Sequence, residues 1–240
     1  MKAFLLAAGH GTRLRPLTDT IPKCLVPIRG VPLLEIWLQV CRRAGIDEVL
    51  VNLHAHADTI RNRLCLHENG MRVRLVEEPV LLGSAGTLLA NRQWVGREPY
   101  FWILYADVLT NADLGRMVDF HRARSSMATI GMYQVKDPQR CGVVTFDEGF
   151  VVRNFEEKPA CPKSNWAFAG LMIATPELLD AIPERSPVDL GFDVLPQLAG
   201  RVSAYPISEY LLDIGTLANY QLAQTTWPGL AEVRTHGAVQ

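Results

Sequence analysis

Apolar segments of strand length alternate with amphipathic segments of helix length through the first half of the chain. Between the apolar segments, hydrophobic residues recur at helical spacing from Leu33 to Ala44, where Gly45 provides a stop, and again in Ala85–Trp94 and Leu114–Arg122. This alternation predicts an α/β fold with a doubly wound, mostly parallel, Rossmann-like sheet and helices on both faces. The predicted strands are Lys2–Ala7, Glu48–Leu53, Arg72–Glu77, Phe101–Tyr105 and Ala128–Gln134.

The pattern changes after about residue 135, where strand-length segments follow one another closely around turn residues. Three such segments predict antiparallel strands that form a smaller lobe over the sheet. We expect a single domain over residues 1–227, divided near residue 135, and a loose tail at 228–240. The elements predicted after the division are strands Val143–Phe146, Val151–Glu156 and Ala169–Ala174, helices near Pro176–Ile182 and Phe192–Leu198, strand Val202–Pro206, and a helix from Thr216 to about Thr225.

The composition argues against several classes of protein. Lys and Arg (24) nearly balance Asp and Glu (25), the net charge is −1, and no basic stripe is visible, so we expect no nucleic-acid partner. No run of about 18 apolar residues occurs, so we expect no membrane partner. The odd number of cysteines and the lack of a CxxC pair argue against a disulfide framework or a zinc site, and predict a cytoplasmic protein. The cysteines are Cys24, Cys41, Cys65, Cys141 and Cys161.

The first predicted strand runs directly into a Gly-rich turn, Ala8–Arg13, with the sequence Ala-Gly-His-Gly-Thr-Arg. Such a turn at the carboxyl end of a strand presents backbone N–H groups that suit phosphate oxygens, and Arg13 adds a permanently charged fork. Leu14 stands where a dinucleotide fingerprint needs a third glycine, and the Gly-Lys-Ser/Thr of a P-loop is missing. A polyphosphorylated ligand and a tight turn without a ligand are both consistent with this turn alone.

Further polar residues follow other predicted strands, at the edge where open α/β sheets bind ligands. Lys23 lies in a proline-flanked, extended segment that can reach back across the Gly-rich turn. Asp107 ends an apolar strand and Asp213 has a similar setting, and two such carboxylates suit one Mg²⁺. The alternative for Asp107 is a cap for the following helix or turn. Lys158 can meet a second phosphate and Glu157 can accept from hydroxyl groups, the alternative being a solvated charge run.

A further strand-to-helix loop, Glu77–Gly86, contains two glycines. Because Gly83 and Gly86 carry no side chain, they would let a planar base approach the backbone closely. His10, inside the Gly-rich turn, is expected to face water rather than phosphate.

Seven separate motifs occur in an order that resembles a known enzyme family. They are LAAGHGTRLRPLT, IPKCLVPI, EEPVLLGSAGTL, YADV, CGVV, FEEKP and LLDIGT, and they extend from Met1 to about Thr225. In this order they resemble the sugar-1-phosphate nucleotidyltransferases, also called nucleotide-sugar pyrophosphorylases. The similarity is greatest to the mannose-1-phosphate guanylyltransferases, with the N-acetylmuramate 1-phosphate uridylyltransferases as near relatives. We expect no counterpart of the left-handed β-helix domain that many members carry.

The resemblance implies that residues 1–135 bind a nucleoside triphosphate and that residues 136–227 bind a sugar 1-phosphate. Arg13, Lys23, Asp107 and Asp213 would be catalytic, with Asp107 and Asp213 holding Mg²⁺. The nucleotide-binding residues would be Leu6, Ala7, Ala8, Gly9, Gly11, Thr12, Arg13, Lys23, Glu78 and Gly83. The sugar-phosphate-binding residues would be Gly142, Glu157, Lys158 and Gly170.

The reaction implied is attack by a sugar 1-phosphate oxygen on the α-phosphorus of the triphosphate, with release of pyrophosphate, most in keeping with a GDP-mannose-type product. Alternatives are UTP- or CTP-dependent transfer to another sugar 1-phosphate, and a non-catalytic nucleotide-sugar sensor or regulatory subunit of the same fold. A sensor should have lost Arg13, Lys23 or a metal aspartate, and this chain retains them. The chain departs from mannose-handling members at Phe168, where they often have Asn, and in a longer Glu78–Gly83 loop. Assembly into a homo-oligomer is left open.

Overall fold

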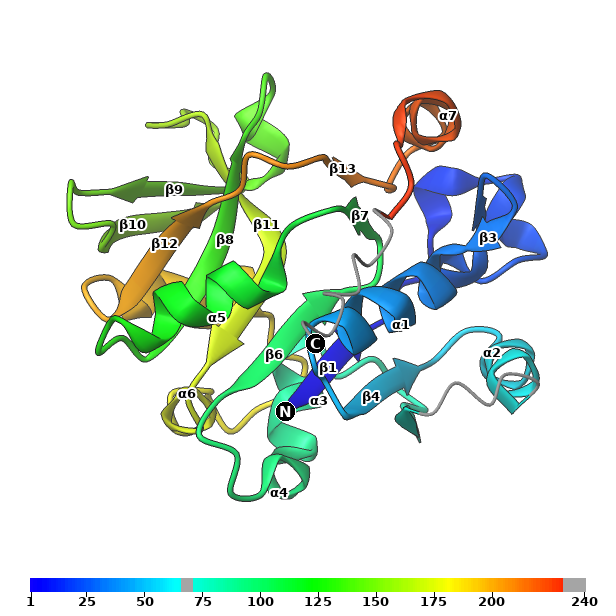
Figure 1. Cartoon of the computed structure of the whole chain (residues 1–240), viewed down its shortest axis with the longest axis horizontal. Helices are drawn as coiled ribbons and strands as arrows, with labels where there is room; N and C mark the ends of the chain where they lie inside the picture. The colour runs from blue at the N-terminus through cyan, green and yellow to red at the C-terminus, as the bar shows by residue number, and fades with distance from the viewer. Residues whose placement is uncertain (66–70, 231–240) are drawn as a thin grey trace, which may run out of the picture.

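The structure is a computed structural model that describes residues 1–65 and 71–230. Most of the predicted tail, from residue 231 onward, therefore lies outside the described residues. A nine-stranded mixed sheet forms the centre of the molecule, with the β9–β10 hairpin and helix α2 towards opposite ends (Figure 1). Its strands are β1 (Lys2–Leu6), β4 (Glu48–Leu53), β5 (Arg72–Glu77), β6 (Phe101–Tyr105), β8 (Ala128–Gln134), β9 (Gly142–Phe146), β10 (Val152–Glu157), β11 (Trp166–Ala174) and β12 (Val202–Pro206).

The sheet has a parallel part and an antiparallel part. Strands β6, β1, β4 and β5 are parallel neighbours in that order. Next to β6, strand β11 runs antiparallel and also pairs antiparallel with β8 and β9, while β10 pairs with β9 and β12 with β8. The predicted second lobe thus extends the central sheet. Strand β8, predicted with the parallel group, is separated from it by β11, and it pairs antiparallel with β11 and parallel with β12. A hydrophobic pattern predicts a strand but does not identify its partner.

Two hydrophobic cores lie on the two faces of this sheet. Ala3 and Leu5 of β1 face the core that α1 and α5 cover, whereas Phe4 faces the core that α3, α4 and α6 cover. Strands β1, β4 and β6 are therefore buried on both sides, as the predicted fold class requires, whereas the edge strand β5 is partly exposed. The helices are α1 (Leu33–Arg43), α2 (Ala57–Cys65), α3 (Ser84–Ala90), α4 (Arg92–Val95), α5 (Leu114–Arg122), α6 (Glu177–Asp180) and α7 (Leu217–Thr226).

Local signals explain several helix ends. Gly45, after α1, has a φ of +68° that an L residue rarely adopts. Asp113 accepts a hydrogen bond from the Arg116 N–H (3.1 Å) at the start of α5, and Thr216 accepts from the Asn219 N–H (3.2 Å) at the start of α7. Each side chain satisfies a backbone donor that the first turn of a helix leaves free.

Three predictions differ from the structure in detail. Helix α2 has no counterpart among the predictions, and the helix predicted over Ala85–Trp94 breaks at Asn91 into α3 and α4. The segment 190–198 forms a π-helical turn followed by a 3-10 turn, since Pro196 has no N–H to continue a regular helix. Among the described residues, no helix combines the length and the apolar character needed to cross a membrane.

Two small ribbons complete the fold: β2 (Pro27–Ile28) with β3 (Val31–Pro32), and β7 (Val108–Thr110) with β13 (Leu211–Asp213).

Candidate active site

The Gly-rich turn after β1 is anchored on both sides. The Ala7 N–H donates to Asn52 Oδ1 (2.7 Å), and the Gly11 carbonyl accepts from Thr18 Oγ1 (2.7 Å). Gly11 has a φ of +65°, and a Cβ at this position would stand 3.1 Å from Lys23 Cβ, so glycine is required here. No described residue accepts a hydrogen bond from the N–H groups of residues 8–10, which leaves them available to an anion.

Asp107 and Asp213 are brought together by the β7–β13 ribbon beside the main sheet (Figure 1). Asp107 comes between β6 and β7, and Asp213 is the last residue of β13. The Ile214 N–H donates to the Asp107 carbonyl (2.8 Å), which holds the two backbones side by side. Two carboxylates that are far apart in the sequence thus share one edge of the sheet.

Lys23 lies against this carboxylate pair. Its Nζ donates to Asp107 Oδ2 at 2.6 Å, and its side chain is 10% exposed. A 3-10 turn that begins after Pro22 sets its direction, and its Cβ borders Gly11. Lys23 therefore reaches back across the Gly-rich turn, where the sequence placed it.

Asp213 has an unsatisfied carboxylate oxygen. Burial, together with the Asp107 carboxylate, raises the pKa of Asp213, while Lys23 and Arg13 act in the opposite direction. Its Oδ1 is buried and accepts no hydrogen bond from any described residue. A Cβ on Gly215 would lie 2.7 Å from this oxygen and 3.0 Å from Arg13 Nη2, so arginine and aspartate crowd around the same glycine.

The carboxylate pair fits a divalent metal ion. A buried oxygen without a donor is a place where a cation would restore charge balance. Residues 1–65 and 71–230 contain no group of three or more His, Cys, Asp or Glu side chains arranged around a metal position. Mg²⁺ commonly takes one or two protein carboxylates and completes its octahedron with water and phosphate oxygens, which matches Asp107 and Asp213.

A cavity of about 230 Å³ opens beside the carboxylate pair. The pairing register of β11 shifts between Phe168 and Met172, and Gly170 in this interval has a φ of +71°. A Cβ on Gly170 would come within 3.0 Å of Tyr105 Cβ, so glycine keeps the strand close to β6 here. The predicted site residues in the cavity wall are Arg13, Asp107, Gly142, Glu157, Lys158, Gly170 and Asp213. A smaller cavity of about 30 Å³, which also includes Asp107, is bordered by Leu6, Ala7, Gly9 and Lys23.

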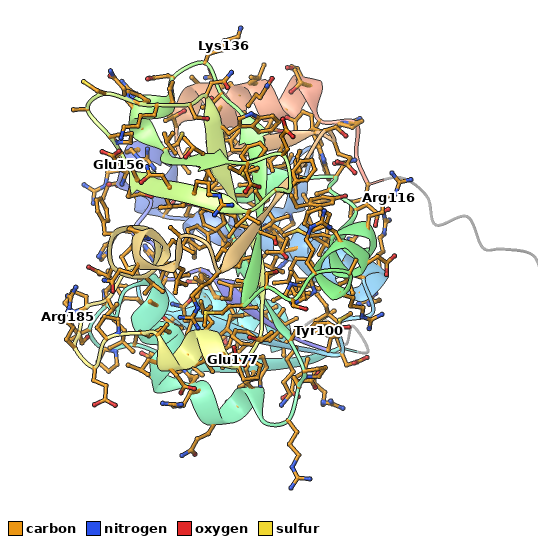
Figure 2. The ribbon with its side chains drawn as sticks, turned by 90° about the vertical axis from the view of Figure 1, so that its left-hand side faces the viewer. Tyr100, Arg116, Lys136, Glu156, Glu177 and Arg185 are labelled. Atoms are coloured by element: carbon orange, nitrogen blue, oxygen red, sulfur yellow. The ribbon has the colours of Figure 1, made fainter. Side chains whose placement is uncertain are left out.

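Glu157 stands in a slot between two glycines. A Cβ on Gly142 would lie 2.7 Å from Glu157 Oε2, and a Cβ on Gly191 would lie 2.5 Å from it. Burial is the main cause that raises the pKa of Glu157, and the Asp189 carboxylate adds to it. Strand alternation turns the neighbouring Glu156 outwards, to the edge of the molecule in Figure 2. The Glu157 carboxylate is therefore directed into the cavity.

Lys158 accompanies Glu157 at this end of the cavity. Its Nζ lies 3.6 Å from Glu157 Oε1 and 5.3 Å from the centre of the Phe192 ring. A carboxylate next to an ammonium group can bind a hydroxyl group and a phosphate of one ligand.

Glu78 and Gly83 form no part of either cavity wall. Glu78 is 3% exposed, and its Oε1 accepts from Asn52 Nδ2 (3.0 Å) and Thr87 Oγ1 (2.5 Å). A Cβ on Gly83 would lie 2.3 Å from the Val188 carbonyl oxygen. The missing side chain at Gly83 therefore makes room for the Val188 backbone and not for a planar base. Glu78 is linked to the Gly-rich turn indirectly, through Asn52.

Sequence reasoning missed Asn52, Ser84 and Asp189. Asn52 is 5% exposed within an otherwise apolar strand, and a polar residue buried in such a strand is a signal that could have been used. Ser84 Oγ donates to Asp189 Oδ2 at 2.8 Å across 105 residues of chain, and nothing in the sequence connects the two.

This fold and site define an α/β protein with a Gly-rich turn whose backbone N–H groups are available to an anion, a pair of carboxylates suited to a metal ion, and cations along the same cavity. The family model described as nucleotidyl transferase matches residues 2–227, and the chain belongs to this family.

Two relatives and two solved structures illustrate the similarity. The chain is 32% identical over 222 residues to the catalytic subunit beta of mannose-1-phosphate guanylyltransferase from Xenopus tropicalis, covering 90% of this chain and 61% of that protein. It is 35% identical over 221 residues to a UTP–glucose-1-phosphate uridylyltransferase from Synechocystis sp., covering 82% and 55%. The chain thus spans less than two thirds of the length of these relatives.

The solved structures share the fold. UDP-glucose pyrophosphorylase from Acinetobacter baumanii has a TM-score of 0.80 at 24% identity, covering 93% of this chain and 91% of that one. HddC from Yersinia pseudotuberculosis has a TM-score of 0.78 at 24% identity, covering 93% and 97%.

Proposed function

We propose that the protein transfers a nucleoside monophosphate from a nucleoside triphosphate to a sugar 1-phosphate, giving a nucleoside diphosphate sugar and pyrophosphate. The observation that carries this proposal is a single cavity whose wall holds Arg13, Lys158 and the carboxylates Asp107 and Asp213, with Lys23 bonded to Asp107. Cations at two places along one cavity suit two phosphorylated reactants. Membership of the nucleotidyl transferase family supports the same reaction class.

The charged residues of the cavity would counter the electrostatic repulsion that opposes this reaction. Both reactants are anions, so their repulsion and the charge developing on the transferred phosphoryl group raise the barrier. Arg13, Lys23 and the N–H groups of the Gly-rich turn would hold the triphosphate, while Lys158 would hold the sugar phosphate. Mg²⁺, held by Asp107 and Asp213, would supply further positive charge when bound. Positioning the two phosphates in line makes a covalent protein nucleophile unnecessary.

For the substrates, we propose GTP with a mannose-type sugar 1-phosphate first, and UTP or CTP with another sugar 1-phosphate as the alternative. Several relatives are named mannose-1-phosphate guanylyltransferase at 31–33% identity, and this supports the first combination. The Phe168 ring, 5.7 Å from the Tyr105 ring, belongs to the cavity wall where mannose-handling members often have Asn. The sugar is therefore the choice that the assay must decide.

We also propose a cytoplasmic location. Cys24 and Cys41 are buried free thiols, and burial raises the pKa of each to about 12, so they behave as inert, reduced core residues.

A matrix of pyrophosphate-release assays tests the reaction. GTP, UTP, CTP and dTTP are each combined with mannose 1-phosphate, glucose 1-phosphate and N-acetylmuramate 1-phosphate at saturating Mg²⁺. We expect release with at least one pair, and a loss of about 100-fold or more in Asp107→Ala. Asp180→Asn is the matched control, because Asp180 is exposed and pairs with Arg92 on α4. Triphosphate binding without pyrophosphate release from any pair would overturn the proposal and favour a nucleotide-sugar sensor.

A further inference from the structure

Residues 82–86, which lead into α3 and form its first turn, and residues 188–192, which lead into the π-helical segment and form its start, make one hydrogen-bonded unit. We call them the 82–86 loop and the 188–192 turn. The Val188 N–H donates to the Leu82 carbonyl (2.9 Å), and the Val188 carbonyl accepts from the N–H groups of Ala85 (3.0 Å) and Gly86 (3.1 Å). Gly83 allows this approach, since a Cβ there would collide with the Val188 backbone. The first donors of α3 are therefore already occupied by the 188–192 turn.

A side-chain bridge links the same two segments on the cavity side. Ser84 Oγ donates to Asp189 Oδ2 (2.8 Å) and accepts from the Leu190 N–H (2.7 Å). The other oxygen of Asp189 accepts from the N–H groups of Gly191 (2.8 Å) and Phe192 (3.1 Å). Both oxygens of this carboxylate are thus engaged, and its position fixes the backbone of the turn.

The 188–192 turn forms part of the cavity wall next to Glu157. Asp189, Gly191 and Phe192 line the cavity, and the Gly191 Cα packs so closely on Glu157 that a Cβ would lie 2.5 Å from Oε2. Phe192 in turn lies beside Lys158. The position of this turn therefore sets the room available to the two residues that would hold the sugar phosphate.

We propose that Ser84 is a positioning residue for the sugar 1-phosphate, acting through Asp189 and the 188–192 turn on Glu157 and Lys158. The inference rests on the proposed function, because it assigns this end of the cavity to the sugar phosphate. Ser84 itself forms no part of the cavity wall, so its effect on the ligand is transmitted.

The substitution Ser84→Ala isolates this effect. The backbone hydrogen bonds of Val188 do not involve the Ser84 side chain, so alanine keeps the loop and the turn joined. What alanine removes is the donor to Asp189, the acceptor for the Leu190 N–H, and a side-chain hydrogen bond with Tyr105 of the cavity wall. A charged acceptor that loses one donor can reorient, and the change reaches Glu157 through Gly191.

Binding and kinetics are measured in the full chain with matched variants. Calorimetry gives the dissociation constants of GTP and of mannose 1-phosphate separately, and pyrophosphate release gives kcat and both KM values. If the activity matrix selects another pair of substrates, that pair is used instead. Ser84→Thr keeps the hydroxyl group, and Ser208→Ala is a control at an exposed serine remote from the cavity wall.

For Ser84→Ala we expect the dissociation constant and the KM of the sugar 1-phosphate to rise about tenfold, as loss of a hydrogen bond to a charged group predicts. The triphosphate dissociation constant should change less than about twofold, and Ser84→Thr should restore sugar 1-phosphate binding. Equal weakening of both ligands, or no weakening of either, would overturn the inference.

A second variant keeps the inference testable if Ser84→Ala fails to fold. Asp189→Asn acts on the other end of the same hydrogen bond. The double variant should bind sugar 1-phosphate no more weakly than the weaker-binding single variant, and additive losses of binding would overturn the coupling.

The binding measurements also separate the two proposals. A parent protein that binds sugar 1-phosphate without turnover refutes the proposed reaction alone, whereas one that binds none of the three sugar 1-phosphates refutes both.

Discussion

Replacing Asn52 with leucine tests whether this buried side chain holds the Gly-rich turn in place. Asn52 Oδ1 accepts from the Ala7 N–H (2.7 Å), and its Nδ2 donates to Glu78 Oε1 (3.0 Å) and Thr87 Oγ1 (3.1 Å). Leucine is similar in volume, so the substitution acts mainly through lost hydrogen bonds and leaves little empty space. The variant therefore separates hydrogen bonding from packing at this position.

The expected magnitude follows from the groups that lose a partner. A fully buried neutral donor costs about 1–3 kcal/mol when left unsatisfied, so the part-buried Ala7 N–H costs at most about that much, and a bond to a charged carboxylate is worth about 1.5–3 kcal/mol. Glu78 keeps its bonds from Thr87 and from the Leu82 N–H, which limits the loss. We expect the free energy of unfolding to fall by about 3–5 kcal/mol, and Tm by about 6–20 °C.

Urea unfolding and kinetics well below Tm measure the two consequences separately. Because the Ala7 N–H no longer has its acceptor, the Gly-rich turn should sample more conformations, and kcat/KM for the triphosphate should fall about tenfold or more. Asn165→Leu, at an exposed asparagine, is the matched control. An unfolding free energy within about 0.5 kcal/mol of the parent value, with kcat/KM unchanged, would refute the reasoning.

Three further predictions concern the carboxylate pair and a buried histidine. Asp213→Asn should abolish pyrophosphate release. The variant should be at least as stable as the parent protein in urea at neutral pH, because burial disfavours the charged form of Asp213. A large loss of stability would contradict this reasoning. Gly215→Ala should reduce kcat about tenfold or more, since its Cβ would press on Asp213 and Arg13; parent-like kcat would show that the site relaxes freely. Burial lowers the pKa of His121 below its ordinary 6.5, so the unfolded chain binds a proton at His121 more readily than the folded protein does. The free energy of unfolding should therefore fall as the pH drops below about 6.5, by at most about 1.4 kcal/mol per pH unit. The fall should level off below the pKa of His121 in the folded state. Urea titrations between about pH 7.5 and 5 should show this slope in the parent and not in His121→Gln, and equal slopes would count against it.

The parts of the fold that are predictable from the sequence are those in which the local pattern and the burial agree. Strands β1, β4 and β6 are short, mostly apolar runs that are largely buried, whereas the edge strand β5 alternates apolar residues with exposed charged ones. The bounds of all four match the predictions within a residue. Helix α2 escapes prediction because it contributes little more than Ala57 and Ile60 to the core, so it carries a weak hydrophobic pattern.

Pairings between distant segments are the parts that a single sequence does not reveal. Asp107 and Asp213 could be expected at the ligand-binding edge from their positions after apolar runs, but the β7–β13 ribbon that joins them is three residues long on each side. The contact of Gly83 with Val188 is likewise invisible, because a glycine suggests close approach without indicating what approaches. The candidate site residues are predicted from the resemblance of the ordered motifs to a known family, because hydrophobic periodicity cannot assign their roles.

Two lysines of the site are already paired with carboxylates before any substrate arrives, and this shapes how the proposed reaction would begin. Lys23 is bonded to Asp107 at 2.6 Å, and Lys158 lies 3.6 Å from Glu157. A phosphate that takes Lys23 must compete with Asp107, and it would leave that carboxylate free to share a metal ion with Asp213. Charge balance therefore favours the arrival of the triphosphate together with its metal ion, because either one alone would leave a partly buried group without a partner.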